Sequence, residues 1–274
     1  MVKKVVGMYF SPTGTTEKVV QKLVEDLSSI LKCEKDYVDF TLPGVRERVQ
    51  SFTEDDLVVF GTPVYAGRVP NVLLKYIHTV QGCGALAVPI VLFGNRNYDD
   101  ALAELQALLI EDGFITVAAG AFVGEHSFSR ILGAGRPDSL DLDIAEKFAD
   151  DIAKKILSAP SIEAFKPVHT GGEYPSKGYY QPRDRKGNPV DIRKVKPKTS
   201  DDCTDCKICA KVCPMGSIDF NDVREFTGIC IKCGSCIKKC PVGAKYYDAE
   251  SYLYHQHELE LEYTRRAEPS LFLN

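Results

Sequence analysis

The sequence lacks several features that would point to a membrane or to nucleic acid. No apolar run approaches the roughly 20 residues that a membrane-spanning helix needs, so no membrane association is expected. The formal net charge is -4, so there is no excess of basic residues of the kind that binds nucleic acid. Tryptophan is absent altogether, so any aromatic ring that stacks on a ligand must come from another residue type.

The beginning of the chain carries only a weak likeness to a secretory signal. Two lysines, Lys3 and Lys4, precede an apolar stretch. That stretch is too short for the apolar core of a signal, and no small-residue cleavage site follows it. We therefore interpret it as a first buried strand and expect a cytoplasmic protein.

Cysteine is scarce outside one segment of the chain. Cys33 and Cys83 stand alone, and the other eight of the ten cysteines fall between positions 203 and 240. A secreted protein held together by disulfides would spread its cysteines along the chain. The clustering instead favours a reducing compartment and metal ligation, with Cys33 and Cys83 as inert thiols.

Residues 1–158 alternate between short β-branched runs and longer segments of helical period. Apolar residues recur at helical spacing around Leu23, Leu105 and Phe148. Several of the short runs are almost continuously apolar, as parallel strands buried on both faces are. The pattern predicts a doubly wound α/β domain with a five-stranded parallel sheet, which binds ligands at the carboxyl ends of its strands. The expected strands are Val2–Phe10, Lys35–Phe40, Leu57–Gly61, Leu86–Gly94 and Phe114–Phe122.

The rest of the chain divides into three parts. Residues 159–202 are rich in proline and glycine and show no core pattern, which predicts an extended linker. The tyrosines of this linker favour docking on a neighbouring surface, with a disordered tether as the alternative. Residues 203–245 hold the clustered cysteines. Residues 246–274 are expected to form a short helix packed on one of the domains.

The strongest motif is an internal repeat within residues 203–245. The spacing C-x2-C-x2-C-x3-C-P occurs twice, once ending at Pro214 and once at Pro241. This spacing is typical of proteins with two four-iron clusters, in which the fourth cysteine of each run ligates the other cluster. The expected ligands are Cys203, Cys206, Cys209 and Cys240 for one [4Fe–4S] cluster, and Cys230, Cys233, Cys236 and Cys213 for the other.

Zinc and disulfide bonds are the alternative explanations of these cysteines. Zinc sites favour separate C-x2-C pairs, and a third cysteine followed by C-x3-C-P is not their spacing. The whole segment resembles the bacterial two-[4Fe–4S] ferredoxins. That resemblance implies a small α+β dicluster domain and one-electron transfer through each cluster.

A candidate phosphate loop follows the first expected strand. The segment S-P-T-G-T-T occupies positions 11–16 and leads into a helical segment. Backbone N–H groups and hydroxyls at the beginning of a helix bind phosphate, aided by the helix dipole. No Gly-Lys-Ser/Thr occurs there, which excludes a nucleoside-triphosphate loop and favours a monophosphate ester such as FMN. Simple helix capping is the alternative. The candidate FMN-binding residues of this loop are Ser11, Thr13, Gly14, Thr15 and Thr16.

Two more loops follow strands at the same expected edge of the sheet, at residues 61–70 and 94–100. With positions 11–16 they resemble the phosphate loop and the two ring loops of the flavodoxin family, over residues 1–158. This resemblance implies bound FMN, with Tyr65 or Tyr98 stacked on its ring. The ring contacts that it implies are Pro63, Val64, Tyr65, Ala66, Gly67, Gly94, Asn95, Arg96 and Tyr98.

Charged and titratable residues in these loops suggest a reaction centre. Arg68 and Arg96 stand where small electron-carrier flavodoxins tend to have acidic residues. An arginine near the flavin N1 would stabilise the anionic reduced flavin and raise its potential. His126 follows the fifth strand at the same edge. We therefore take Arg96 and His126 as candidate catalytic residues, His126 as a proton donor, with ordinary hydrogen bonding as the alternative for His126.

The order of the segments resembles fused flavodoxin–ferredoxin proteins of anaerobic bacteria and archaea. The resemblance implies an oxidoreductase that passes electrons between an external donor, two [4Fe–4S] clusters and FMN, which reduces a small molecule. Two alternatives stay open, namely an electron-transfer protein that serves a partner protein and a redox sensor. The partner would be a redox protein or a small-molecule acceptor, and a homodimer is left open.

Overall fold

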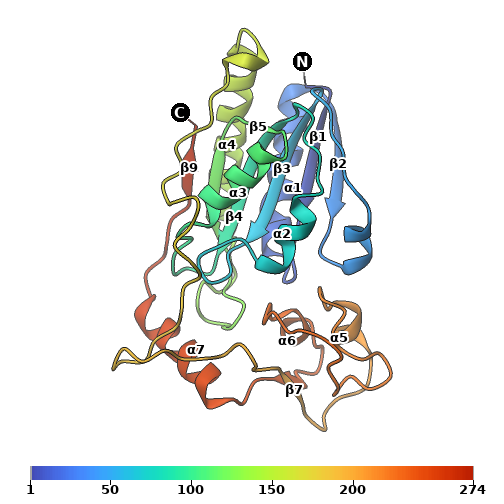
Figure 1. The fold of residues 1–274 in the computed structure, drawn as a ribbon, viewed down its shortest axis with the longest axis vertical. Coiled ribbons are helices and arrows are strands. Elements are labelled where there is room, and N and C mark those ends of the chain that lie inside the picture. Colours follow the sequence, from blue (N-terminus) through green and yellow to red (C-terminus); the bar gives the residue numbers. More distant parts are fainter. Residues whose placement is uncertain (1, 274) are drawn as a thin grey trace.

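The computed structural model of the chain describes residues 2–273. A sheet covered by helices forms one part of the molecule, and a small cysteine-rich module lies beneath one end of the sheet (Figure 1). The amino-terminal end of the chain lies at the opposite end of the sheet from this module. The carboxyl ends of the parallel strands therefore face the cysteines.

Parallel strands form the centre of the sheet. β1 (Lys4–Tyr9) lies between β2 (Glu34–Asp39) and β3 (Asp56–Pro63), and β4 (Leu86–Phe93) follows on the other side of β3. All of these neighbours are parallel. This order, continued by a fifth parallel strand beside β4, is the flavodoxin-like order of doubly wound sheets. The predicted fold class is confirmed.

The fifth predicted strand, Phe114–Phe122, is interrupted. It forms β5 (Ile115–Thr116) and β6 (Ala119–Val123), and both pair with β4 in parallel. Val117 and Ala118 lie between the two pieces and are fully buried. An unbroken apolar run does not reveal such an interruption, because both pieces face the core.

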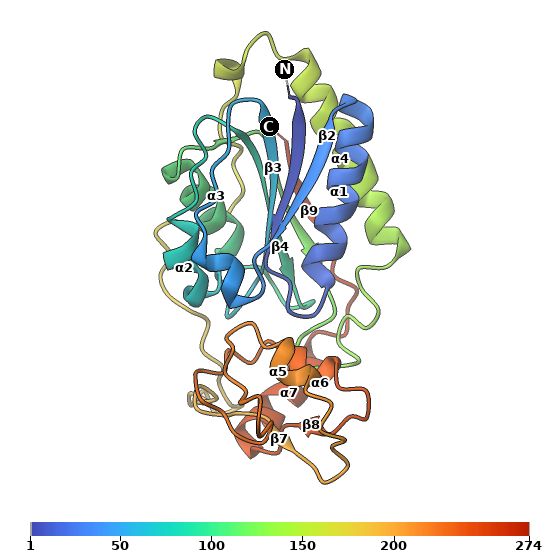
Figure 2. The same ribbon diagram turned by 90° about the vertical axis from the view of Figure 1, so that its right-hand side faces the viewer.

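Helices cover both faces of the sheet, as Figure 2 shows. Their apolar sides are buried at the predicted positions, including Leu23, Leu105 and Phe148. Burying such a side chain contributes roughly 1.5–3 kcal/mol, so the two cores under the helices stabilise the domain. Across residues 2–273, no helix combines the length and the apolar character needed to cross a membrane. The helices are α1 (Thr15–Leu31) and α4 (Ser139–Ser158) on one face, and α2 (Asn71–Ile77) and α3 (Ala101–Glu111) on the other.

The cysteine-rich module contains two short helices and a two-stranded sheet. α5 (Ile208–Lys211) and α6 (Ser235–Lys238) each belong to one copy of the repeat. β7 (Lys198–Thr199) pairs antiparallel with β8 (Lys245–Tyr246). The folded module therefore begins at β7, earlier than the expected start at position 203, because backbone pairing leaves no mark in the cysteine pattern.

The linker follows the sheet domain back toward the module (Figure 1). Gln106 on α3 donates a hydrogen bond from Nε2 to the carbonyl of Val168 at 3.0 Å. Further along, the N–H of Tyr180 donates to the carbonyl of Ala66 at 2.7 Å. These contacts carry the linker along α3 to the carboxyl edge of the sheet.

The tail forms the expected helix and one further strand. α7 (Glu250–Glu262) lies beside the module, and β9 (Ser270–Phe272) pairs antiparallel with β6. A strand of 3 residues has no pattern of its own, so this pairing was not predicted. It covers the outer edge of β6, which would otherwise leave backbone groups unpaired.

Candidate functional site

The eight clustered cysteines line two separate cavities. One, here called the first-cluster cavity, is lined by Cys203, Cys206, Cys209 and Cys240. The other, the second-cluster cavity, is lined by Cys213, Cys230, Cys233 and Cys236. The fold thus brings together the same two sets of four thiols that the spacing predicts, with Cys213 and Cys240 exchanged between the repeats.

Each cavity is lined by four thiols, the number that a [4Fe–4S] cluster needs. Within residues 2–273, no group of three or more His, Cys, Asp or Glu side chains is close enough to hold one metal ion. A zinc ion would need its sulfur ligands drawn in to about 2.3 Å from the metal. Burial raises the pKa of the Cys233 thiol to about 12, and a metal centre bound there would supply the positive charge that favours the thiolate.

The candidate phosphate loop joins β1 to α1 and is formed as the sequence predicts. Gly14 adopts φ 90° and precedes the helix, and Ser11 accepts a hydrogen bond on Oγ from the N–H of Glu17 at 2.9 Å. The hydroxyl of Thr16 is buried and has no hydrogen-bond partner among the described residues. The N–H groups of Thr15 and Thr16 likewise donate to no described residue. These unused donors fit an anion such as the FMN phosphate.

A cavity, here called the loop cavity, begins at this phosphate loop and extends under the ring loops. Its lining includes Thr13, Thr15 and Thr16 from the first loop, and Pro63, Val64, Tyr65 and Gly94 from the two ring loops. It continues into a larger cavity of about 620 Å³, which shares Tyr65, Gly94 and His126 with it. Ala66, Gly67 and Arg96 line this large cavity. Gly67 adopts φ 79°, a conformation that favours glycine.

Two predicted ring contacts serve other roles. Tyr98 packs against Phe93 in the apolar core, with ring centroids 5.5 Å apart, and lines neither cavity. Tyr65 lines both cavities and is therefore the better candidate for stacking. Asn95 is buried, and its side chain is fully used in hydrogen bonds to the tail, at Tyr263, Arg265 and Ala267. Sequence reasoning missed this because the partners lie far away in the chain.

The two arginines of the ring loops are paired with carboxylates and tyrosines. Arg68 forms an ion pair with the buried Glu104, and its guanidinium lies 4.5 Å from the ring centroid of Tyr179. Arg96 pairs with Asp99 and lies 4.2 Å from the ring centroid of Tyr180. Arg68 lines neither cavity, so the structure gives it no direct role at a flavin ring.

His126 lies where the loop cavity meets the large cavity. Its Nδ1 accepts a hydrogen bond from the N–H of Phe128 at 3.1 Å, which leaves the hydrogen of a neutral ring on Nε2. Burial lowers the pKa of His126 to about 3, and His255, Lys238 and Arg96 act in the same direction. A ring that stays neutral is a poor proton donor, so the geometry favours hydrogen-bond donation from Nε2 over the expected acid role.

The second-cluster cavity adjoins the candidate flavin site. Cys233 lines both the second-cluster cavity and the loop cavity. The next residue, Gly234, comes so close to the loop after β6 that a Cβ there would lie 2.5 Å from the carbonyl oxygen of Ser127. Lys238 on α6 reaches into the same loop, where it pairs with Glu125 and donates to the carbonyl of His126 at 2.8 Å. The module is thereby held against the carboxyl edge of the sheet.

The large cavity is lined by the loops of the sheet domain and by three other parts of the chain. The linker contributes Tyr179 and Tyr180, the second repeat contributes Cys230 and Lys232, and α7 contributes His255. Cys230 was predicted as a cluster ligand. The other four residues were not predicted for any site, since nothing in the sequence marks contacts across such separations. The tyrosines of the linker were the one signal that pointed to docking.

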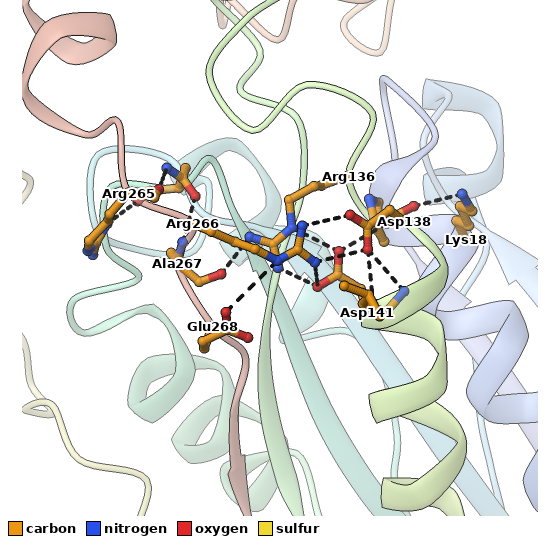
Figure 3. Close-up of polar contacts among 11 residues, drawn as sticks. Lys18, Arg136, Asp138, Asp141, Arg265, Arg266, Ala267 and Glu268 are labelled. Carbon is orange, nitrogen blue, oxygen red and sulfur yellow. Dashed lines mark hydrogen bonds and ion pairs between the residues drawn. The ribbon is translucent and has the colours of Figure 1, made fainter.

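The tail is fixed to the sheet domain by a group of charged residues shown in Figure 3. Arg266 makes two hydrogen bonds to the carboxylate of Asp138, at 2.7 and 2.9 Å. Beside it, the buried Arg136 pairs with the buried Asp141 and donates to the carbonyl of Ala267. The tail thus connects the beginning of α4 with the ring loop at Asn95.

Comparison with known proteins agrees with this division of the chain. The family described as "4Fe-4S binding domain" matches residues 197–219 and 226–246. No curated protein matches the chain.

Each of the following solved structures covers little more than half of this chain. A flavodoxin from the domain Archaea has a TM-score of 0.41 at 13% identity, covering 56% of this chain and 99% of its own. A flavodoxin of Streptococcus pneumonia TIGR4 has 0.39 at 17% identity, with coverage of 56% and 99%. The rubredoxin oxygen:oxidoreductase of the anaerobe Desulfovibrio gigas has 0.40 at 19% identity, with coverage of 57% and 37%.

The strand order and the matched cysteine repeat together identify the two parts of the molecule. The chain consists of an N-terminal flavodoxin-like domain and a C-terminal 4Fe-4S binding domain with eight cysteines.

Proposed function

We propose that this protein is a flavin and iron–sulfur oxidoreductase that passes electrons between an external donor, two [4Fe–4S] clusters and FMN, which reduces a small molecule. The observation that carries the proposal is the position of Cys233. This one cysteine lines both the second-cluster cavity and the loop cavity that begins at the phosphate loop. A cluster and a flavin in these cavities would be neighbours without any partner protein.

The residues of the loop cavity suit FMN. The phosphate would bind to the hydroxyls of Thr13, Thr15 and Thr16 and to the free N–H groups at the beginning of α1. The loop has no lysine or arginine to neutralise the charge of the phosphate. Tyr65 would provide the aromatic face for the ring, and Gly67 permits close approach of the backbone. When bound, FMN would supply two-electron chemistry that the clusters lack.

The two cluster sites differ in their surroundings, which suggests an order of use. The second-cluster cavity adjoins the flavin site through Cys233. The first-cluster cavity shares no lining residue with either flavin-side cavity, and its Cys206 is exposed. An external donor would therefore meet the first cluster, and the second would be the one next to the flavin.

The large cavity is the feature that favours a small-molecule substrate. At about 620 Å³ it falls within the range of ligand pockets, and it opens from the residues predicted to hold the ring. His126 would hold a substrate or the ring by a hydrogen bond from Nε2, while Tyr180 and His255 form its outer wall.

The alternative is an electron-transfer protein that serves a partner protein and has no substrate of its own. Anaerobic reduction with an artificial donor, followed by titration with candidate small-molecule acceptors, separates the two functions. Catalytic turnover of a small molecule, abolished when FMN is removed and restored when it is added back, supports the oxidoreductase. Electron exchange with viologens or cytochromes and no turnover of any acceptor would favour the alternative.

A further inference from the structure

The internal repeat is broken at one buried position. Five residues after the fourth cysteine of the first run stands Ile218, an apolar residue of the module core. Five residues after the fourth cysteine of the second run stands Lys245. Both side chains are buried, with 5% of Ile218 and 2% of Lys245 exposed. The second repeat thus buries a lysine at the position where the first repeat buries an apolar side chain.

Lys245 lines the first-cluster cavity, and its ammonium contacts one lining residue of each cluster cavity. It donates a hydrogen bond to the carbonyl of Val223, which lines the first-cluster cavity. It also lies 5.4 Å from the ring centroid of Phe226, which lines the second-cluster cavity. The charge therefore lies next to the linings of both cavities.

No carboxylate compensates this charge. Among residues 2–273, no Asp or Glu forms an ion pair with Lys245, although two more accessible lysines of the module, the exposed Lys198 and the half-buried Lys207, do have carboxylate partners. Burying an unpaired ammonium costs several kcal/mol, so a fold that keeps one needs an anion nearby. The ammonium contacts one carbonyl and one aromatic ring, and the Lys245 side chain lines the cavity that holds the four thiols of the first set.

Cysteines of both ligand sets lie near these contacts. Cys209 of the first set and Cys236 of the second belong to the same small packed cluster as Val223 and Phe226, the two residues that the ammonium contacts. A cluster with four thiolate ligands carries a net negative charge that grows on reduction, and net charge is one of the factors that set its potential.

We propose that the Lys245 ammonium is a counter-cation shared by the two clusters, which stabilises their reduced states and raises the midpoint potential of both. This inference rests on the two clusters of the proposed function and adds a residue that tunes them. It also explains why the second repeat departs from the first at this position.

The test is a redox titration of the anaerobically purified full chain, followed by electron paramagnetic resonance of the reduced clusters. Lys245→Met removes the charge and keeps a long side chain, and Lys245→Ile installs the residue that the first repeat uses at position 218. We expect both variants to disfavour reduction of each cluster by about tenfold, which is about 59 mV for a one-electron couple. The FMN couple should not move. Lys211→Met, which removes an exposed lysine of the same module, is the matched control and should shift neither cluster.

The outcomes separate this inference from the proposed function. Only assembled clusters give the resonance signal, so a partly loaded variant still reports its potentials. Unchanged potentials in both neutral variants, or a shift confined to one cluster, would overturn the shared role and leave the clusters in place. Absence of any cluster signal from the wild-type protein would instead overturn the proposed function itself.

Discussion

His126 is a buried residue whose charge state depends on its surroundings. Burial lowers its pKa to about 3, with His255, Lys238 and Arg96 acting in the same direction, whereas a histidine of the unfolded chain titrates near 6.5. Between about pH 6.5 and pH 3 the unfolded chain therefore binds a proton that the folded protein does not. The free energy of unfolding must fall as the pH falls through this window.

We expect His126→Asn to remove this sensitivity to acid. His126 should lower the free energy of unfolding of the wild-type protein by about 1.4 kcal/mol at pH 5.5 relative to neutral pH. The variant should not show this decrease. Denaturant unfolding at the two pH values, followed by circular dichroism, measures the difference. His257→Asn replaces an exposed histidine of α7, and its free energy of unfolding should fall at pH 5.5 as much as that of the wild-type protein. If the two variants respond to acid equally, the pKa assigned to His126 is wrong.

At the scale of elements, the tail and the second ring loop are joined through Asn95. This side chain donates to the carbonyls of Tyr263 and Arg265 at 2.8 and 2.6 Å, and accepts from the N–H of Ala267 at 3.1 Å. All three partners are backbone groups of the segment between α7 and β9. The ring loop therefore owes part of its position to the end of the chain.

Replacing Asn95 should release the tail. Asn95→Gly keeps the left-handed backbone, φ 65°, but leaves three backbone groups without their partner, which costs roughly 3 kcal/mol of unfolding free energy. Limited proteolysis of the segment after α7 should be faster, and FMN should bind more weakly. Asn97→Asp, at an exposed position of the same loop, keeps the side-chain oxygen that accepts from the N–H of Asp99 and should change stability by less than about 0.5 kcal/mol. Equal protease resistance of the two variants would contradict the anchoring role.

At the scale of the whole molecule, the structure brings the module and the sheet domain together at Gly234. The residue adopts φ 75°, and a Cβ there would lie 2.5 Å from the carbonyl oxygen of Ser127. The corresponding residue of the first repeat, Lys207, also has a positive φ, 62°. The backbone turn therefore belongs to the repeat, whereas the close approach to Ser127 belongs to the interface.

We expect Gly234→Ala to push the module away from the flavin site. Gly243→Ala is the matched control, since Gly243 has φ 68° but no atom within 4 Å of an added Cβ. The free energy of unfolding should fall by about 1–2 kcal/mol in both variants, because alanine is strained in the left-handed backbone conformation. Only Gly234→Ala should slow electron transfer from the clusters to FMN several-fold, measured by stopped-flow absorbance. Equal rates in the two variants would show that the interface at Ser127 does not control the transfer.

Much of this arrangement could be predicted from the sequence, because it depends on local patterns. Continuous apolar runs predict the parallel strands, and the repeated cysteine spacing predicts which thiols share a cavity. The loop at positions 11–16 is formed by its own residues, such as Gly14 with its positive φ.

The remaining features depend on contacts between distant segments. No periodicity in the sequence marks these contacts. They include the pairing of Asn95 with the tail, the position of Tyr180 beside Arg96, and the position of Cys233 at the candidate flavin site. For the same reason the sequence did not reveal that Arg68 pairs with Glu104, which lies on α3. A residue type in a loop predicts its charge but not its counter-ion.

The central claim is that one chain holds two four-iron clusters beside one flavin. Iron, acid-labile sulfide and FMN, quantified together in anaerobically purified protein, test it most directly. The account predicts about eight irons, about eight sulfides and about one FMN per chain. One or two zinc ions in place of iron, clearly fewer than about eight irons in intact protein, or a chain that binds no FMN when supplied with it would contradict the account.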